Sequence, residues 1–179
     1  MNFAEYNVKD ANLEEVLLAL KSLDTVEAVA LGGSRSTGAN DENSDYDIYV
    51  YCTEIPTAET RENLRSAIIK NNRNLLNGKL PSYDRQIKKA QERGDIVSVN
   101  HRITAFLESY FDVIFALNRQ THPGEKRQVQ LCKKYCTLLP KDFEENINAL
   151  MKSISDGGSY EIVTAMVNNL DEILNDEFK

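Results

Sequence analysis

The sequence predicts an α+β protein in which a small α/β part is followed by a helical bundle. Two short apolar segments typical of strands lie near the N-terminus, at residues 26–31 and 46–51, and a polar stretch that contains glycine separates them. After Pro56 the apolar residues recur at three- and four-residue steps, which is the period of an amphipathic helix. The chain therefore divides into an α/β part, residues 1–58, and a helical domain, residues 59–179. Because a sheet of two strands is only marginally stable by itself, we expect the α/β part to pack against the helices or against a second copy of the chain, as in a homodimer.

Helices are expected before the first strand and throughout the second part. Residues 12–23 carry an apolar stripe that includes Leu13 and Leu20. In the second part, Pro81 suits the first turn of a helix, and Gly94 bends or interrupts a long one. The expected helices there are one marked by Leu64, Ala67, Ile68 and Leu75, a long one over residues 83–118, and three shorter ones over residues 128–138, 143–154 and 160–174.

Composition and charge exclude several classes of protein. The chain has 179 residues, 41% hydrophobic and 27% charged, as in an ordinary soluble globular protein. No apolar run approaches the roughly 20 residues that cross a bilayer, and the N-terminal residues do not resemble a secretion signal. With 21 Lys and Arg against 28 Asp and Glu, the net charge is -7. This charge disfavours nucleic acid or anionic lipid as a partner, because the long-range field has the wrong sign, although a local basic pocket is still compatible with it.

The three cysteines indicate a cytoplasmic protein. Cys52 lies in an apolar run, and Cys132 and Cys136 are one helical turn apart. An odd number of cysteines is not a disulfide scaffold, and His101 and His122 lie at no recognised zinc-site spacing from them. We expect packed, reduced thiols.

A glycine pair, Gly32-Gly33, follows the first strand, and Ser34 comes next. Since glycine lacks Cβ, the backbone N–H groups of such a turn approach a ligand closely. If a helix begins at Ser34, its free N–H groups and its dipole favour a phosphate there. Taken alone, the same residues are equally typical of an ordinary turn.

Two aspartates, Asp45 and Asp47, begin the second strand. The strand period of two sends both carboxylates to the same face. Paired carboxylates suit Mg²⁺ (or Mn²⁺), and two metals roughly 4 Å apart can clamp a phosphoryl transfer. A solvated entry to the strand is the alternative interpretation of the pair by itself.

The order of these features is more specific than either feature alone. Nucleotidyl transfer requires a phosphate-binding turn close to a metal site, and the sequence has both in order: a strand, Gly-Gly-Ser, a polar connector, Asp-Tyr-Asp and a second strand. In this interpretation the turn holds the triphosphate of an NTP, and metals neutralise charge on the α-phosphate and the pyrophosphate. The sequence is not a P-loop. Gly33 and Gly38 have the spacing of its glycines, but Ala39 and Asn40 stand where Lys and Ser/Thr belong.

These motifs resemble the signature of the polymerase-β-type nucleotidyltransferase superfamily. The resemblance rests on Gly32-Gly33-Ser34-Arg35-Ser36 followed by Asp45-Tyr46-Asp47, and it is similar in style to the bacterial branch of aminoglycoside and minimal nucleotidyltransferases. Residues 100–102, 115–118 and 123–127 resemble the helical domain of uncharacterised bacterial members. The resemblance thus implies a nucleotidyltransferase-type α/β part followed by helices.

The resemblance also implies an activity, namely transfer of a nucleoside monophosphate from an NTP to a hydroxyl of a small molecule or protein. Asp45 and Asp47 match the catalytic, metal-binding carboxylates. The nucleotide-binding candidates are Gly32, Gly33, Ser34, Arg35 and Lys126. Arg35 could instead pair with acidic surface groups, and Lys126 with Arg127 could be a solvated helix start.

One expected feature of the superfamily, a third carboxylate on a further strand, is missing. The chain passes from Thr53-Glu54-Ile55-Pro56 directly into helical sequence, as though a sheet segment between about Arg61 and Leu64 had been excised. Asp95 is the best local substitute if residues 96–99 are a strand, but a solvent-facing helix position is the preferred interpretation.

The missing carboxylate leaves alternatives to an active enzyme. One is a non-catalytic regulator, derived from this family, that binds nucleotide or a partner protein. Another is a purely structural helical protein. The aromatic residues Phe106, Tyr110, Phe111 and Phe115 have helical spacing and are expected in the core, with base stacking as the second interpretation.

Overall fold

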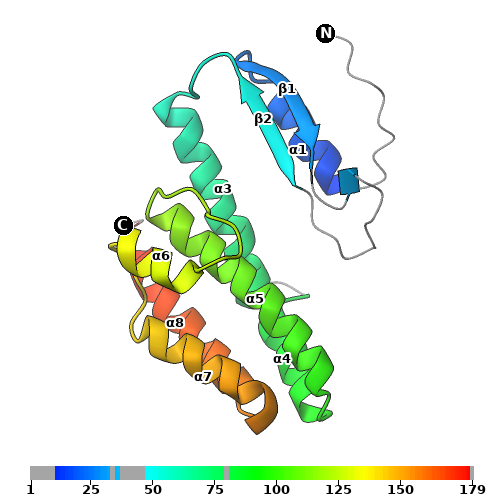
Figure 1. Cartoon of the computed structure of the whole chain (residues 1–179), viewed down its shortest axis with the longest axis vertical. Helices are drawn as coiled ribbons and strands as arrows, with labels where there is room; N and C mark the ends of the chain where they lie inside the picture. The colour runs from blue at the N-terminus through cyan, green and yellow to red at the C-terminus, as the bar shows by residue number, and fades with distance from the viewer. Residues whose placement is uncertain (1–10, 33–34, 37–46, 79–80, 178–179) are drawn as a thin grey trace. The chain divides into compact units, whose positions relative to one another are not determined.

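The structure, a computed structural model, describes residues 11–32, 35–36, 47–78 and 81–177, except for the side chains of residues 11, 12 and 15. The chain forms two compact units, residues 1–61 and 62–179. The first unit holds a helix and two strands and the second is helical, so the predicted α+β class is confirmed (Figure 1). None of the described helices is long and apolar enough to span a membrane.

The first unit is built from α1 (Ala11–Lys21), β1 (Val26–Leu31) and β2 (Ile48–Cys52). The predicted strand 26–31 is confirmed. The second strand was predicted over residues 46–51. The observed strand, β2, begins at Ile48 and ends at Cys52. The two strands pair antiparallel, with Leu31 opposite Ile48, and an irregularity in β1 between Val26 and Ala28.

The two faces of this sheet differ in composition. One face carries Val29, Leu31 and Ile48, which are half-buried, and Val50, which is 40% exposed. The other carries the two tyrosines of β2, Tyr49 and Tyr51, which are 58% and 57% exposed. Because side chains alternate along a strand, this asymmetry identifies the covered face and the open face of the sheet.

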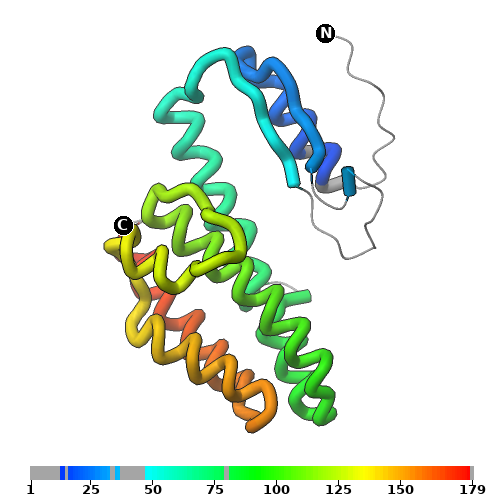
Figure 2. The backbone as a smooth tube through the Cα atoms, in the orientation of Figure 1, coloured from blue at the N-terminus to red at the C-terminus, as the bar shows by residue number. Residues whose placement is uncertain are grey.

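The second unit begins within α3 (Ala58–Asn77) and continues through five further helices. They are α4 (Tyr83–Glu92), α5 (Ile96–Leu117), α6 (Gln128–Tyr135), α7 (Phe143–Asp156) and α8 (Ser159–Glu177). Helix α5 packs against α4, α6 and α7, while α8 packs against α4 and α7 (Figure 2). The core of the unit therefore lies around α5.

The aromatic cluster of α5 is in this core, as predicted. Phe106 and Tyr110 are fully buried and their rings stack 5.8 Å apart, and Phe111 and Phe115 are 3% and 2% exposed. The predicted alternative of base stacking by these rings is thereby excluded. Cys132 and Cys136 are also buried, all three cysteines are free thiols, and burial raises the pKa of both buried ones.

The long predicted helix over residues 83–118 is interrupted and not merely bent. Gly94 has φ = +67°, a left-handed conformation that L-amino acids with side chains rarely adopt, and it separates α4 from α5. Pro81 precedes the N-cap residue Ser82, so its predicted place in the first helical turn is wrong.

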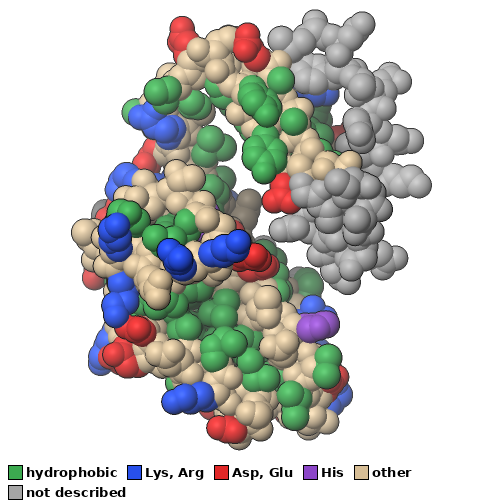
Figure 3. Space-filling view, viewed as in Figure 1, with side chains coloured by type: hydrophobic (Ala, Val, Ile, Leu, Met, Phe, Trp, Pro, Cys, Tyr) green, Lys and Arg blue, Asp and Glu red, His purple; other side chains and the backbone are tan. Residues whose placement is uncertain are grey.

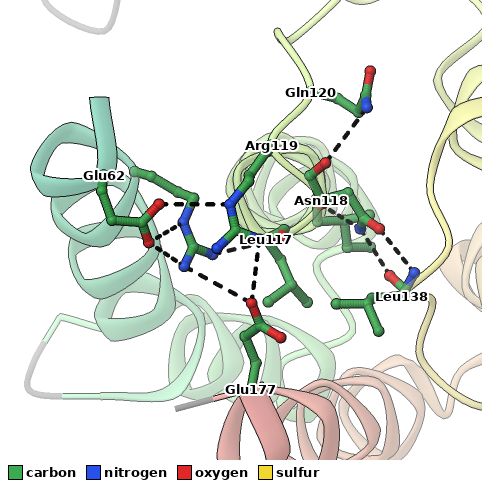
Figure 4. Close-up of polar contacts among 9 residues, drawn as sticks. Glu62, Leu117, Asn118, Arg119, Gln120, Leu138 and Glu177 are labelled. Atoms are coloured by element: carbon green, nitrogen blue, oxygen red, sulfur yellow. Dashed lines mark hydrogen bonds and ion pairs between the residues drawn. The ribbon is translucent and has the colours of Figure 1, made fainter. Parts of the chain in front are cut away.

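Helix α6 is shorter than the predicted 128–138 because the chain after it pairs with a side chain. Asn118, at the end of α5, donates from Nδ2 to the carbonyl of Leu138 (2.8 Å) and accepts from its N–H at Oδ1 (2.8 Å) (Figure 4). This pair of bonds holds Leu138 in an orientation outside the helix, which ends at Tyr135.

An ion cluster holds α3 against the ends of α5 and α8. Arg65, only 8% exposed, pairs with Glu62 and lies 3.9 Å from Glu177, and it donates to the carbonyl of Leu117 (Figure 4). Arg119 lies 3.6 Å from Glu62 and 3.4 Å from Glu177. The hydrogen bond from Arg65 is the main reason that the pKa of Glu62 is lowered.

Candidate functional site

The glycine turn and the aspartate-bearing strand meet at one end of the sheet. The strand pairing ends with Leu31 opposite Ile48, and one residue further the N–H of Gly32 donates to the carbonyl of Asp47 (2.7 Å). This bond continues the antiparallel ladder beyond the strands. Two of the residues predicted to form the site, Gly32 and Asp47, are therefore neighbours.

Gly32 and Asp47 also share a face of the sheet, and so does Tyr49. A Cβ on Gly32 would lie 2.4 Å from Cε2 of Tyr49 and 3.4 Å from Cβ of Asp47. The tyrosine ring thus occupies the space that a side chain at position 32 would need, so glycine is required for this close approach. Asp47 is exposed, which leaves its carboxylate accessible on the open face.

Helical structure follows the turn. Arg35 and Ser36 are helical, and the N–H of Ser36 donates to the carbonyl of Gly32 (3.2 Å), a spacing of four residues. Arg35 is half-buried. Gly33, Ser34 and Asp45 lie outside the described residues, so their roles stay predictions.

Lys126 belongs to the second unit, where it is exposed in the connection between α5 and α6. Its neighbour Arg127 is the N-cap residue of α6, in a left-handed conformation with φ = +59°. A role for Lys126 at a nucleotide stays a prediction.

Whether a third carboxylate joins Asp45 and Asp47 is not tested, because Asp45 lies outside the described residues. No three His, Cys, Asp or Glu residues among those described are grouped so that they could hold one metal ion. The candidate substitute, Asp95, is the N-cap of α5 and accepts from the N–H of Ser98 (3.0 Å) and from its hydroxyl (2.7 Å). These two bonds lower the pKa of Asp95. Since Ile96 begins a helix, the alternative of a strand over residues 96–99 is wrong.

A second polar cluster surrounds His122 in the connection between α5 and α6. Its Nδ1 accepts from the N–H of Gly124 (3.1 Å), and its Nε2 lies 3.1 Å from the side-chain amide of Gln128 and 3.9 Å from Asp112. Burial raises the pKa of Asp112, and the nearby His122 partly opposes this shift.

The position of Tyr49 was not part of the predicted site. The signal was nevertheless in the sequence, because a residue two positions after Asp47 shares its face in any strand. Tyr49 was interpreted only as a β-forming residue of the second strand. Its contact with Gly32 depends on the cross-strand register, which the sequence did not specify.

Comparison with known proteins identifies the family. No curated protein and no solved structure matches the chain. The model of the family described as "Polymerase beta, Nucleotidyltransferase" matches residues 14–136, which include most of α1, both strands and the helices from α3 to α6. Members of this family generally use a divalent metal and an NTP. The match spans more than half of the sequence, and the chain belongs to the polymerase β nucleotidyltransferase family.

Proposed function

We propose that this protein uses Mg²⁺ (or Mn²⁺) to transfer a nucleoside monophosphate from an NTP to a hydroxyl group of a small molecule or protein. Family membership supports the class of reaction. The observation that supports this site is the hydrogen bond between Gly32 and Asp47, because one residue is proposed to bind phosphate and the other to bind metal.

The proposed binding roles follow the chemistry of each group. Gly32, Gly33 and Ser34 cradle the triphosphate, and the cationic side chain of Arg35 balances its charge. Asp45 and Asp47 are the proposed catalytic residues and metal ligands, and the exposed carboxylate of Asp47 is the hard oxygen donor that Mg²⁺ prefers. A bound metal supplies charge neutralisation at the phosphates.

Catalysis makes a further demand on the chain. The attacking hydroxyl must lose a proton, and losing a positioned base typically lowers the rate about 10² to 10⁴-fold. No apolar strand with a third carboxylate is recognisable in the sequence after β2. We therefore propose that NTP binding is retained while transfer is slow.

The same observation favours a second candidate function, a non-catalytic regulator that binds nucleotide or a partner protein. The two candidates share the binding site and differ only in turnover. For either, the three free thiols favour a cytoplasmic protein, and the net charge of -7 makes nucleic acid an unfavourable partner. A homodimer would give the two-stranded sheet further support.

Titration calorimetry with NTPs, with and without Mg²⁺, tests the binding site. The double variant Asp45→Asn/Asp47→Asn is expected to lose Mg²⁺-dependent binding. Glu27→Gln, which neutralises an exposed carboxylate of β1, is the matched control and is expected to bind as the wild type does. Equal binding by the double variant and the wild type would contradict the metal role.

A labelled-NTP transfer assay separates the two functions. The acceptors are aminoglycosides, nucleotides and proteins, and analytical ultracentrifugation records the oligomeric state of the same samples. Slow, Mg²⁺-dependent labelling that disappears in the double variant supports the enzyme. Binding with no labelling of any acceptor supports the regulator.

A further inference from the structure

The open face of the sheet in the first unit is arranged as three cross-strand rows. Tyr51 lies opposite Ala28 and Tyr49 opposite Ala30, and the bond between Gly32 and Asp47 forms the end row. Residues directly opposite each other share a face. One edge of this face therefore has very small side chains, and the other has two aromatic rings and a carboxylate. Its members are Ala28, Ala30, Gly32, Asp47, Tyr49 and Tyr51.

The two rings are available to a ligand. Tyr49 and Tyr51 are 58% and 57% exposed, and Figure 3 shows exposed hydrophobic side chains over the two strands. By contrast, the aromatic cluster of α5 is buried. Exposed aromatic rings that lie side by side on a sheet are a surface on which planar groups stack, since every nucleobase has a π-face.

We propose that this face binds the nucleobase of the NTP, with the ring of Tyr49 as the principal stacking surface and Tyr51 beside it. The inference rests on the proposed function. It deepens that function by assigning the base end of the nucleotide to named residues. Ala28 and Ala30 leave room for a planar group, because neither side chain rises beyond one methyl group above the sheet.

The position of the ring agrees with this assignment. The backbone of Tyr49 lies about 7 Å along the strand from that of Asp47, and its ring leans from its own row toward Gly32. A nucleobase stacked on the outer surface of this ring would lie within the span of one ribose from phosphates bound at Gly32 and Asp47.

The ring of Tyr49 lies beside Gly32. Its Cε2 lies 2.4 Å from the place where a Cβ of residue 32 would be, and glycine at position 32 is what permits this. The ring is therefore next to the turn that is proposed to bind phosphate, and it is exposed on the open face of the sheet.

Calorimetric titration of the full chain with two probes tests the assignment. The probes are the tightest-binding of ATP, GTP, CTP and UTP, and inorganic tripolyphosphate, each with Mg²⁺. Tyr49→Ala and Tyr49→Leu are expected to weaken NTP binding about 5- to 100-fold, as stacking on one ring predicts, and to leave tripolyphosphate binding unchanged. Tyr49→Phe keeps the ring and is expected to bind NTP as the wild type does.

Tyr135→Ala is the matched control, because this residue is 51% exposed but lies on α6 in the second unit. It is expected to leave the binding of both probes unchanged. Far-UV circular dichroism verifies that each variant is folded, and Tyr49→Leu keeps an apolar side chain if Tyr49→Ala does not fold.

The outcomes separate the inference from the proposed function. If the wild type binds NTP and Tyr49→Leu binds it equally well, the base site is wrong while the proposed function stands. If Tyr49→Leu weakens tripolyphosphate as much as NTP, the ring has a structural role and the base site is again wrong. If the wild type binds neither probe, both proposals fail.

Discussion

The N–H of Gly32 donates a 2.7 Å hydrogen bond to the carbonyl of Asp47, one residue beyond the last paired residues of β1 and β2. This bond makes the position of the Asp47 carboxylate depend on the backbone of the glycine turn. A carboxylate attached to a loop could move independently of the turn, whereas here both belong to one ladder. Changes at Gly32 are therefore expected to affect the site before they affect the fold.

Gly32→Ala tests this dependence. The new Cβ would lie 2.4 Å from Cε2 of Tyr49, so the ring must swing away. Because the ring is exposed and flexible, we expect a loss of unfolding free energy of about 1 kcal/mol or less, together with clearly weaker NTP binding. Thermal unfolding and calorimetry measure the two effects.

Tyr49→Ala provides the control for the Gly32 substitution. In a Gly32→Ala/Tyr49→Ala double variant the steric conflict is absent. The change in unfolding free energy of the double variant should therefore differ from the sum of the changes in the two single variants. Strictly additive values would show that the ring and residue 32 do not interact.

Arg65→Ala is expected to destabilise the second unit by about 1–3 kcal/mol. The side chain of Arg65 is 8% exposed, and its removal takes the closest cation from Glu62 and one of two cations from Glu177. Both carboxylates are partly solvated, which reduces the loss below that of a fully buried pair. Arg119→Ala, in which the removed side chain is 60% exposed, is expected to change stability by less than about 1 kcal/mol. Urea unfolding compares the two, and equal losses would contradict the importance of burial.

Tyr110→Phe is expected to stabilise the protein by about 1 kcal/mol. Its hydroxyl is buried with no hydrogen-bond partner in the described part of the chain, so the folded state loses the hydration of this group without replacing it. Burial also raises the pKa of this phenol. The matched variant Tyr135→Phe removes an exposed hydroxyl and should be neutral in the same urea titration. A Tyr110→Phe variant less stable than the wild type would reveal a partner for the hydroxyl.

Asp95→Ala should lower the thermal stability of the second unit and leave Mg²⁺-dependent NTP binding unchanged. The substitution removes the acceptor for the N–H and hydroxyl of Ser98 at the start of α5. Because folding lowers the pKa of Asp95, its contribution is present above the unfolded pKa and is lost as the pH falls through the folded value. Asp95→Asn keeps an acceptor and should recover part of the stability. Loss of metal-dependent binding in either variant would instead indicate that Asp95 is a metal ligand of the catalytic site.

The sequence predicted those parts of the fold that depend on local patterns. The short apolar segment before the glycine pair predicted β1 closely, and the helical period together with Pro and Gly predicted most of the helical segments. It did not decide whether Gly94 bends or interrupts the long helix, since glycine permits both. The end of α6 was also missed, because it depends on the side chain of Asn118, which is distant in sequence.

The same distinction applies to the site. Gly32 and Asp47 were predicted from the order of motifs, and their proximity needs only that two strands pair. The place of Tyr49 over Gly32 depends on a register that no local pattern specifies. The burial of Arg65 gave no local signal either, since besides its neighbour Glu62 it depends on Leu117 and Glu177, which are distant in sequence.

The stability of the protein should depend on pH through the carboxyl group of Asp112. Burial raises the pKa of this carboxyl above its unfolded value of about 3.9, so the unfolded chain ionises first as the pH rises. The contribution of Asp112 to stability is therefore fully present below the unfolded pKa and is lost as the pH rises through the folded pKa. Asp112→Asn carries no titrating group, so its stability relative to the wild type should increase across this window and level off above it. His122 limits the effect, because a positive charge on its ring favours the ionised carboxylate.

Urea unfolding of the wild type and Asp112→Asn at a series of acidic pH values measures the difference. The control is Glu172→Gln, which replaces an exposed carboxylate of α8. A difference between Asp112→Asn and the wild type that does not change with pH would mean that the carboxyl is fully hydrated in the folded protein.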